Sequence, residues 1–122
     1  MSPSSVHHIN FVVRDLDEAC SRFEDALGLE RFERVDHALR GATVARSRVG
    51  ETWLVLVAPY DPATVPGRFL EEHGEGFFLL SLAVDALQES RAGILDWRVK
   101  DVGEIKGALF QFTEAEKRDA SN

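Results

Sequence analysis

The residues best suited to chemistry lie near the start of the chain, where residues 6–13 read VHHINFVV. Side chains alternate along a strand, so His8 and Asn10 share one face and the larger apolar residues share the other. An imidazole that titrates near neutral pH can bind a metal, move a proton or hold a ligand through a hydrogen bond. His8 is therefore the main candidate for a catalytic residue. The alternative is a polar residue that pairs with a neighbour inside the fold.

A helix should follow this strand and position it. Asp15 has the place of an N-cap, and Glu18 follows at the spacing of a capping box. Apolar residues then recur at helical spacing, and Gly28 stands where a glycine ends a helix. Packing this helix on the apolar face of the strand leaves His8 and Asn10 on an open face.

The remaining chain is expected to be mostly strands, with one short helix at Pro66–His73. The expected strands cover residues 29–35, 42–49, 52–58, 77–84, 97–102 and 108–113. The expected organisation is a single domain over 1–122, divided into a first module of 1–58, a crossover of 59–76, a shortened second module of 77–113 and a polar tail of 114–122.

The second module has little room for a helix, because only residues 88–96 separate its first strand and turn from the next strand. The strand face that such a helix would cover consists of Phe78, Leu80, Leu82 and Val84. Burying four large apolar side chains is worth roughly 6–12 kcal/mol, so this face should not stay in water. Either a further stretch of chain or a second subunit should cover it, and we expect a homodimer.

Composition narrows the class of partner. The formal net charge is -7, and no basic stripe is present to neutralise the phosphates of nucleic acid or of an anionic membrane. The longest apolar run, Phe77–Val84, is too short to span a bilayer, and no secretory signal is visible. Cys20, the only cysteine, falls on the apolar face of the expected helix and suits the core of a cytoplasmic protein.

Four stretches occur in the order that is typical of one family: 6–13 (VHHINFVV), 15–29, 69–76 (FLEEHGEG) and 107–112 (GALFQF). Together they resemble the vicinal oxygen chelate superfamily of glyoxalases, bleomycin-resistance proteins and dioxygenases, and most of all its methylmalonyl-CoA epimerase-like branch. The resemblance implies an α+β fold in which paired βαβββ modules form a half-open barrel, here with an abbreviated second module.

The resemblance also implies a metal site, and its four ligand positions fall on His8, Val55, Leu79 and Gln111. Valine and leucine offer no donor atom, and glutamine offers only a neutral amide. His8 is thus the only ligand position that is retained. We therefore expect a degenerate metal site, with no metal or other cofactor.

Alternation along the strands, combined with the implied barrel, predicts which side chains surround a cavity. The expected ligand-binding residues are Asn10, Trp53, Val55, Phe77, Leu79, Ser81 and Gln111. Trp53 either stacks on a planar ligand or packs in the core. Arg46 and Arg48 share a strand face and either clamp an anion or form a solvated, salt-bridged edge. The apolar replacements favour a small apolar or aromatic ligand.

Two classes of function remain open. One is a glyoxalase-like enzyme of isomerase, epimerase or lyase type that acts through His8 without the usual metal. The other is a metal-free binding or drug-sequestering protein of the bleomycin-resistance type. Catalysis needs an acid or base in the cavity, for which His8 is the main candidate, whereas binding needs none. We expect an enzyme-derived small-molecule site and leave open whether it is catalytic.

Overall fold

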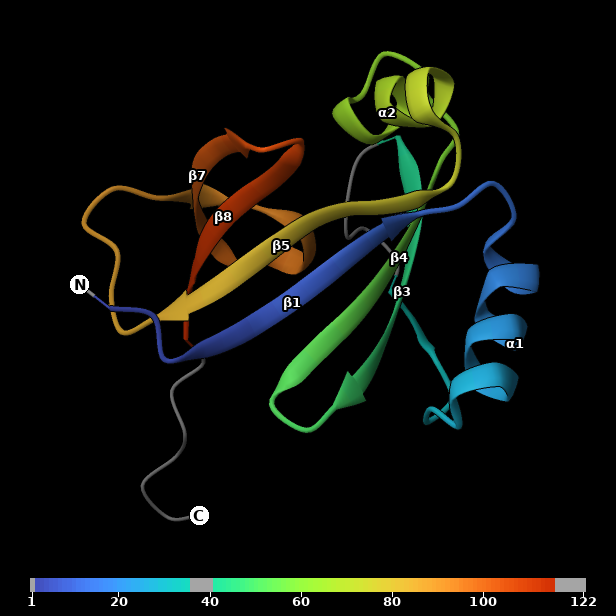
Figure 1. The fold of residues 1–122 in the computed structure, drawn as a ribbon, viewed down its shortest axis with the longest axis horizontal. Helices are drawn as coiled ribbons and strands as arrows, with labels where there is room; N and C mark the ends of the chain where they lie inside the picture. Colours follow the sequence, from blue (N-terminus) through green and yellow to red (C-terminus); the bar gives the residue numbers. More distant parts are fainter. Residues whose placement is uncertain (1, 36–40, 116–122) are drawn as a thin grey trace.

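The computed structural model describes residues 2–35 and 41–115, which form one mixed sheet and two α-helices (Figure 1). The helices and strands are β1 (Ser5–Val12), α1 (Leu16–Leu27), β2 (Glu33–Val35), β3 (Ala42–Val49), β4 (Thr52–Pro59), α2 (Val65–His73), β5 (Gly76–Val84), β6 (Arg91–Ala92), the 3₁₀ turn η1 (Ile94–Asp96), β7 (Arg98–Ile105) and β8 (Ala108–Glu114). Neither α-helix in these residues is long and apolar enough to cross a membrane.

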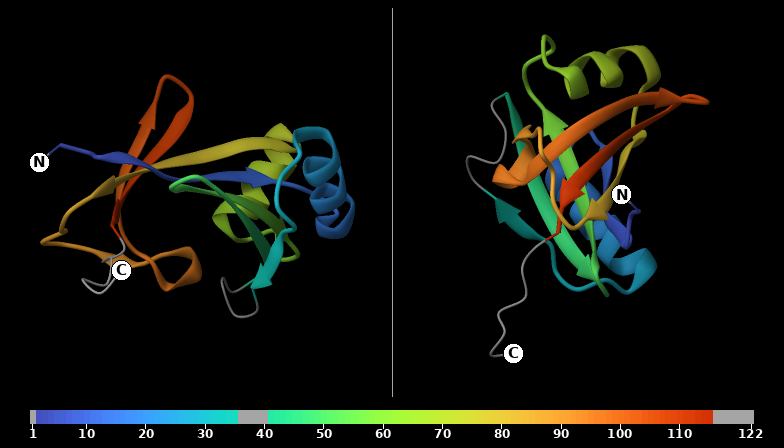
Figure 2. Two further views of the ribbon diagram at one scale, coloured as in Figure 1. Left: turned by 90° about the horizontal axis from the view of Figure 1, so that it is seen from below. Right: turned by 90° about the vertical axis from the view of Figure 1, so that its left-hand side faces the viewer.

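The sheet is built from two similar halves that meet at its centre. The strand order is β2-β3-β4-β1-β5-β8-β7-β6, with β1 and β5 antiparallel to each other. Each central strand is parallel to its outer neighbour, β4 for β1 and β8 for β5. The sheet is not flat but curls, so that its two halves face each other (Figure 2). This is the half-open barrel and the α+β fold that the sequence predicted.

The first half is organised by α1, whose ends follow the local chemistry of the sequence. The Asp15 side chain accepts a hydrogen bond from the Glu18 amide at 3.1 Å, and Gly28 ends the helix with φ 65°. The helix buries Leu16, Ala19 and Cys20 against the convex side of the sheet. This packing turns His8 and Asn10 to the concave side, as expected.

Several strand boundaries differ from the prediction, and those of β2 and β7 differ most. Strand β2 covers only Glu33–Val35, because the residues before it serve as a connection that packs on the core. Phe32 is buried there, and its amide donates to the Glu24 carboxylate at 2.7 Å. Strand β7 covers Arg98–Ile105, so it starts one residue later and ends three residues later than predicted. The expected loop at 36–40 and residues 116–122 of the expected tail lie outside the described residues, whereas Glu114 belongs to β8.

The second half has no α-helix between its first two strands. The chain passes from β5 through residues 85–90 to the two-residue strand β6 and the turn η1. The convex side of β5 and β8 therefore has no counterpart to α1 (Figure 1). The segment that replaces the helix lies on the opposite, concave side, where Trp97 contacts the rings of β1.

Candidate functional site

A cavity of about 590 Å³ lies on the concave side of the sheet, and we call it the main cavity. It is bounded by β1, β4, the start of α2, β5, the segment 91–94, β7 and β8. Its walls are largely apolar and include Val57, Phe78, Leu79, Ile94 and Leu109. Both the volume and the apolar lining are typical of sites for small organic molecules.

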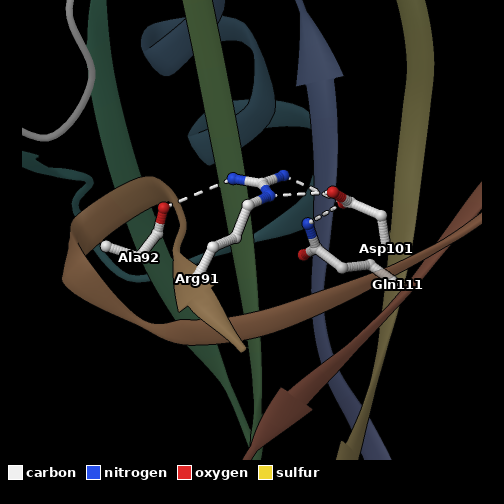
Figure 3. A network of polar contacts seen from close by, with 4 residues as sticks. All are labelled: Arg91, Ala92, Asp101 and Gln111. Atoms are coloured by element: carbon white, nitrogen blue, oxygen red, sulfur yellow. Dashed lines mark hydrogen bonds and ion pairs between the residues drawn. The ribbon is translucent and has the colours of Figure 1, made fainter. Parts of the chain in front are cut away.

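One wall carries a polar network of Arg91, Asp101 and Gln111 (Figure 3). The Arg91 guanidinium donates two hydrogen bonds to the Asp101 carboxylate, at 2.8 and 2.9 Å, and the Gln111 amide donates a third at 3.0 Å. The Arg91 hydrogen bond lowers the pKa of Asp101, against a smaller opposing effect of desolvation. Asp101 is therefore an anchored carboxylate and a weak base.

Asn10 contributes a different kind of polar group to the main cavity. Its side chain is 5% exposed, and its Oδ1 atom is buried without a hydrogen-bond partner among the described residues. Buried acceptors are nearly always paired, because an unpaired one loses its hydration without compensation. Because Asn10 lines the main cavity, its carbonyl is a candidate acceptor for a hydrogen bond from a ligand there.

His8 occupies a different environment from the one expected of a catalytic base. It is fully buried and does not line the main cavity. The Trp97 ring stacks on it with centroids 4.6 Å apart, and His7 Nδ1 lies 2.9 Å from His8 Nδ1. Burial, with a smaller contribution from the neighbouring His7, lowers the pKa of His8 to about 3. The imidazole is neutral at physiological pH and shielded from the main cavity.

The structure brings only some of the predicted ligand-binding residues together. Asn10, Leu79 and Gln111 line the main cavity. Ser81 is buried behind it, where its hydroxyl bonds to Thr113 and donates to the Gln111 carbonyl. Val55 is fully buried in the concave-side core, and Trp53 lies beside it beneath Arg46 and Arg48.

Phe77 was expected in the cavity wall, and the structure places it elsewhere. Strand β5 is bulged against β1, because Asn10 pairs with Leu79 whereas Phe11 pairs with Phe77. The extra residue reverses the alternation. Phe78 consequently lines the main cavity, while Phe77 is 39% exposed and meets Phe11 on the convex side.

Sequence reasoning missed four residues of the concave side: Arg91, Asp101, His7 and Trp97. A second bulge between Val6 and His8 changes the alternation of β1, and the His7 ring lies against both His8 and Trp97. The Arg91–Asp101 pair joins two adjacent strands of the second half. The signal available for Trp97 was the shortness of the segment 88–96, which leaves little room for a helix and does not show which side of the sheet the segment crosses.

The metal implied by the fold family does not fit these residues. His8 is covered by Trp97, and the side chains of Val55 and Leu79 offer no donor atom. Within residues 2–35 and 41–115, no three side chains of His, Cys, Asp or Glu gather as a metal would require. We therefore derive no chemical step through a metal.

Comparison with known proteins identifies the family. Residues 7–108 match the Glyoxalase/Bleomycin resistance protein/Dioxygenase superfamily, and the chain is a member of it. No curated protein matches the sequence.

Solved structures share the fold at low sequence identity. Methylmalonyl-CoA epimerase from Mycobacterium tuberculosis is 24% identical with a TM-score of 0.73, covering 94% of this chain and 90% of that chain. A variant of the Streptomyces coelicolor methylmalonyl-CoA epimerase, in complex with 2-nitronate-propionyl-CoA, is 19% identical with a TM-score of 0.81. The match covers 95% of this chain and 100% of that chain. A hypothetical protein from Bacillus halodurans C-125 is 18% identical with a TM-score of 0.82, covering 98% and 99%.

Proposed function

We propose that this domain binds a small, largely apolar or aromatic molecule in the main cavity, without a metal. The observation that carries this proposal is the unpartnered Asn10 Oδ1 in a mostly apolar cavity of about 590 Å³. Apolar walls supply affinity, and a single buried acceptor selects ligands that carry an O–H or N–H donor.

The charges of the cavity wall support an uncharged ligand. The positive charge of Arg91 is engaged by both oxygens of Asp101, and one of these oxygens also accepts from Gln111. An anionic ligand would have to break this pairing. A neutral molecule with one hydrogen-bond donor leaves the network in place.

The role of Asn10 can be tested with two ligands that differ by one donor. Naphthol carries a hydroxyl, and its methyl ether does not. We expect wild-type protein to bind naphthol about tenfold more tightly, since one hydrogen bond to a buried group is worth roughly 1–1.5 kcal/mol. Isothermal titration calorimetry measures both affinities.

The Asn10→Leu variant should bind the two ligands equally, because leucine has a similar volume and no acceptor. Val49→Ala is the matched control, since Val49 is 48% exposed on β3 and is not among the residues that line the main cavity. A preference for naphthol that survives in Asn10→Leu would contradict the assignment. Failure of both ligands to bind wild-type protein would contradict the choice of ligand class.

A second candidate function is an isomerase, epimerase or lyase activity at the same cavity. It is favoured by the carboxylate of Asp101 in the cavity wall, the only one among the described lining residues. His8, the acid or base predicted from sequence, lies outside that wall. Proton transfer would then fall to Asp101, which its lowered pKa makes a poor base.

Proton exchange separates the two functions. An enzyme of this class would catalyse deuterium incorporation at the acidic carbon of an acyl thioester or 1,3-dicarbonyl compound in D₂O, and Asp101→Asn would abolish it. We expect the rate with wild-type protein to equal the background rate. Catalysed exchange that depends on Asp101 would establish the enzymatic function.

A further inference from the structure

A second site lies on the concave side under the segment 93–97, which we call the Trp97 segment. This segment forms a tight loop, closed by a hydrogen bond from the Gly93 amide to the Trp97 carbonyl at 2.7 Å. Leu95 and Asp96 both have left-handed backbones, with φ of 60° and 59°. Such conformations are unfavourable for residues with a Cβ atom and persist only where packing compensates for them.

Trp97 supplies that packing by lying on the rings of β1. Its indole stacks on His8 at 4.6 Å and meets the edge of His7 at 4.7 Å. On the neighbouring strands, the Arg46 guanidinium lies 6.0 Å from the Trp97 ring and 4.1 Å from the Trp53 ring. An aromatic side chain of the protein itself thus covers the surface formed by His8, Arg46 and Trp53.

The surface beneath the indole contains polar atoms to which the indole makes no hydrogen bond. His8 Nε2, Arg46 Nε and Trp53 Nε1 are all buried, and none has a hydrogen-bond partner among the described residues. The His8 side chain is fully buried, and His8 pairs directly with Trp53 across β1 and β4. Three unsatisfied polar atoms in one cluster of adjoining side chains are unusual in a native core and indicate a missing polar partner.

The chemistry of these atoms defines that partner. Arg46 Nε and Trp53 Nε1 are donors, so they call for an acceptor, and a guanidinium favours a carboxylate. The stacking position on His8 calls for a planar aromatic ring. Arg46 also lies 3.5 Å from Glu33, a 63% exposed carboxylate that a buried ligand carboxylate can replace.

We propose that the Trp97 segment is a displaceable cover, and that the surface of His8, Arg46 and Trp53 beneath it binds a planar aromatic carboxylate in place of the indole. This site goes beyond the proposed function of the main cavity. The ligand class differs, since the main cavity favours an uncharged donor. The two sites adjoin at Gly93 and Ile94 of the Trp97 segment, which also line the main cavity.

Indoleacetate is the probe, because it carries the displaced ring and adds a carboxylate; methylindole is its neutral analogue. The Trp97→Ala variant lacks the cover. We expect it to bind indoleacetate at least about tenfold more tightly than wild-type protein does, because in wild-type protein the Trp97 segment must first open. In calorimetric titrations, methylindole should bind Trp97→Ala more weakly than indoleacetate does.

The charge preference should depend on one arginine of the pair that flanks Trp53. Arg46→Met should abolish the preference for indoleacetate, both in wild-type protein and in Trp97→Ala. Arg48→Met is the matched control, because Arg48 also lies over Trp53, at 4.7 Å, but its Nε already donates to the Gly50 carbonyl at 2.9 Å. The proposal would be overturned if the two indoles bound with equal affinity and Arg46→Met left both affinities unchanged. The site would then bind indoles through apolar contacts alone.

Displacement of the cover is measured on wild-type protein, so it does not depend on the folding of Trp97→Ala. Saturating indoleacetate should raise amide hydrogen exchange in 93–97 at least several-fold. Binding without faster exchange, or no binding to wild-type protein, would show that Trp97 is a fixed part of the core. Naphthol binding that depends on Asn10 is unaffected by either result, so this proposal and the proposed function can fail separately.

Discussion

The indole of Trp97 covers the imidazole of His8, with ring centroids 4.6 Å apart and planes inclined by 29°. This contact joins the first strand to the segment that stands in place of the second module's helix. It removes from the main cavity the residue that sequence reasoning put at its centre. His8 therefore affects the stability of the fold, and its protonation gives a direct measurement of that effect.

Acid should destabilise the protein through His8. The imidazole pKa is about 3 in the folded protein against 6.5 ordinarily, so below pH 6.5 the unfolded chain binds a proton that the folded protein does not. Its contribution to stability is complete above pH 6.5 and is lost as the pH falls toward 3. We expect a loss of about 2 kcal/mol by pH 5, measured by urea unfolding.

The control for this pH dependence is a neutral replacement. His8→Gln should show a smaller loss of unfolding free energy between neutral pH and pH 5 than wild-type protein does. His73→Gln, at a 61% exposed position of α2, should behave like wild type. Parallel pH profiles for wild type and His8→Gln would show that His8 does not titrate as its burial predicts.

Measuring the metal content tests the prediction that the metal site is degenerate. We expect protein that is purified without chelators to contain well under one equivalent of zinc, cobalt or manganese by elemental analysis. The reason is that Trp97 covers His8, and Val55 and Leu79 offer no donor. One equivalent that disappears in His8→Ala would overturn this prediction and the alignment of ligand positions behind it.

Local patterns predicted those parts of the structure that local interactions determine. The Asp15 cap, the Gly28 stop and the apolar face of α1 depend on residues close in sequence, and the structure confirms all three. Alternation along β1, together with the barrel that the family resemblance implied, also predicted that Asn10 and Leu79 line the main cavity, as they do. Both residues lie where β1 and β5 pair regularly, between the two bulges.

The failures occur where a distant strand or loop sets the geometry. The bulge at Phe77 and Phe78 arises from pairing with β1, which no pattern within β5 reveals. The Arg91–Asp101 pair joins residues 10 positions apart in the sequence. The Trp97–His8 contact joins residues 89 positions apart. Such contacts depend on the path of the chain after β5, and the sequence shows only that this path is short.

The bulge predicts losses of stability of different size for two adjacent phenylalanines. Phe78 is 8% exposed and lines the main cavity, whereas Phe77 is 39% exposed. Phe78→Ala should lower the free energy of unfolding by about 3–5 kcal/mol, as for other buried phenylalanines, and Phe77→Ala by less than about half as much. Urea denaturation of both variants measures this, and a larger loss for Phe77→Ala would place the bulge elsewhere.

The convex side of β5 carries the last prediction, that the chain forms a homodimer. With Phe78 turned inward and Val84 fully buried, the uncovered apolar residues of this strand are Phe77, which is 39% exposed, and Leu80 and Leu82, which are half-buried. Leu82 lies beside Phe112 of the parallel strand β8, which is also half-buried. No α-helix among the described residues covers these side chains, and contiguous apolar surface of this kind is typical of protein interfaces.

We expect sedimentation velocity to show a dimer at micromolar concentration. Leu82→Glu should shift it to monomer with the circular dichroism spectrum unchanged, because a carboxylate buried at an interface loses its hydration without a partner. Val49→Glu, at an exposed position of β3 away from this face, should remain dimeric. A stable wild-type monomer would show that these leucines tolerate water, and that the second half of the fold needs no cover in place of the missing helix.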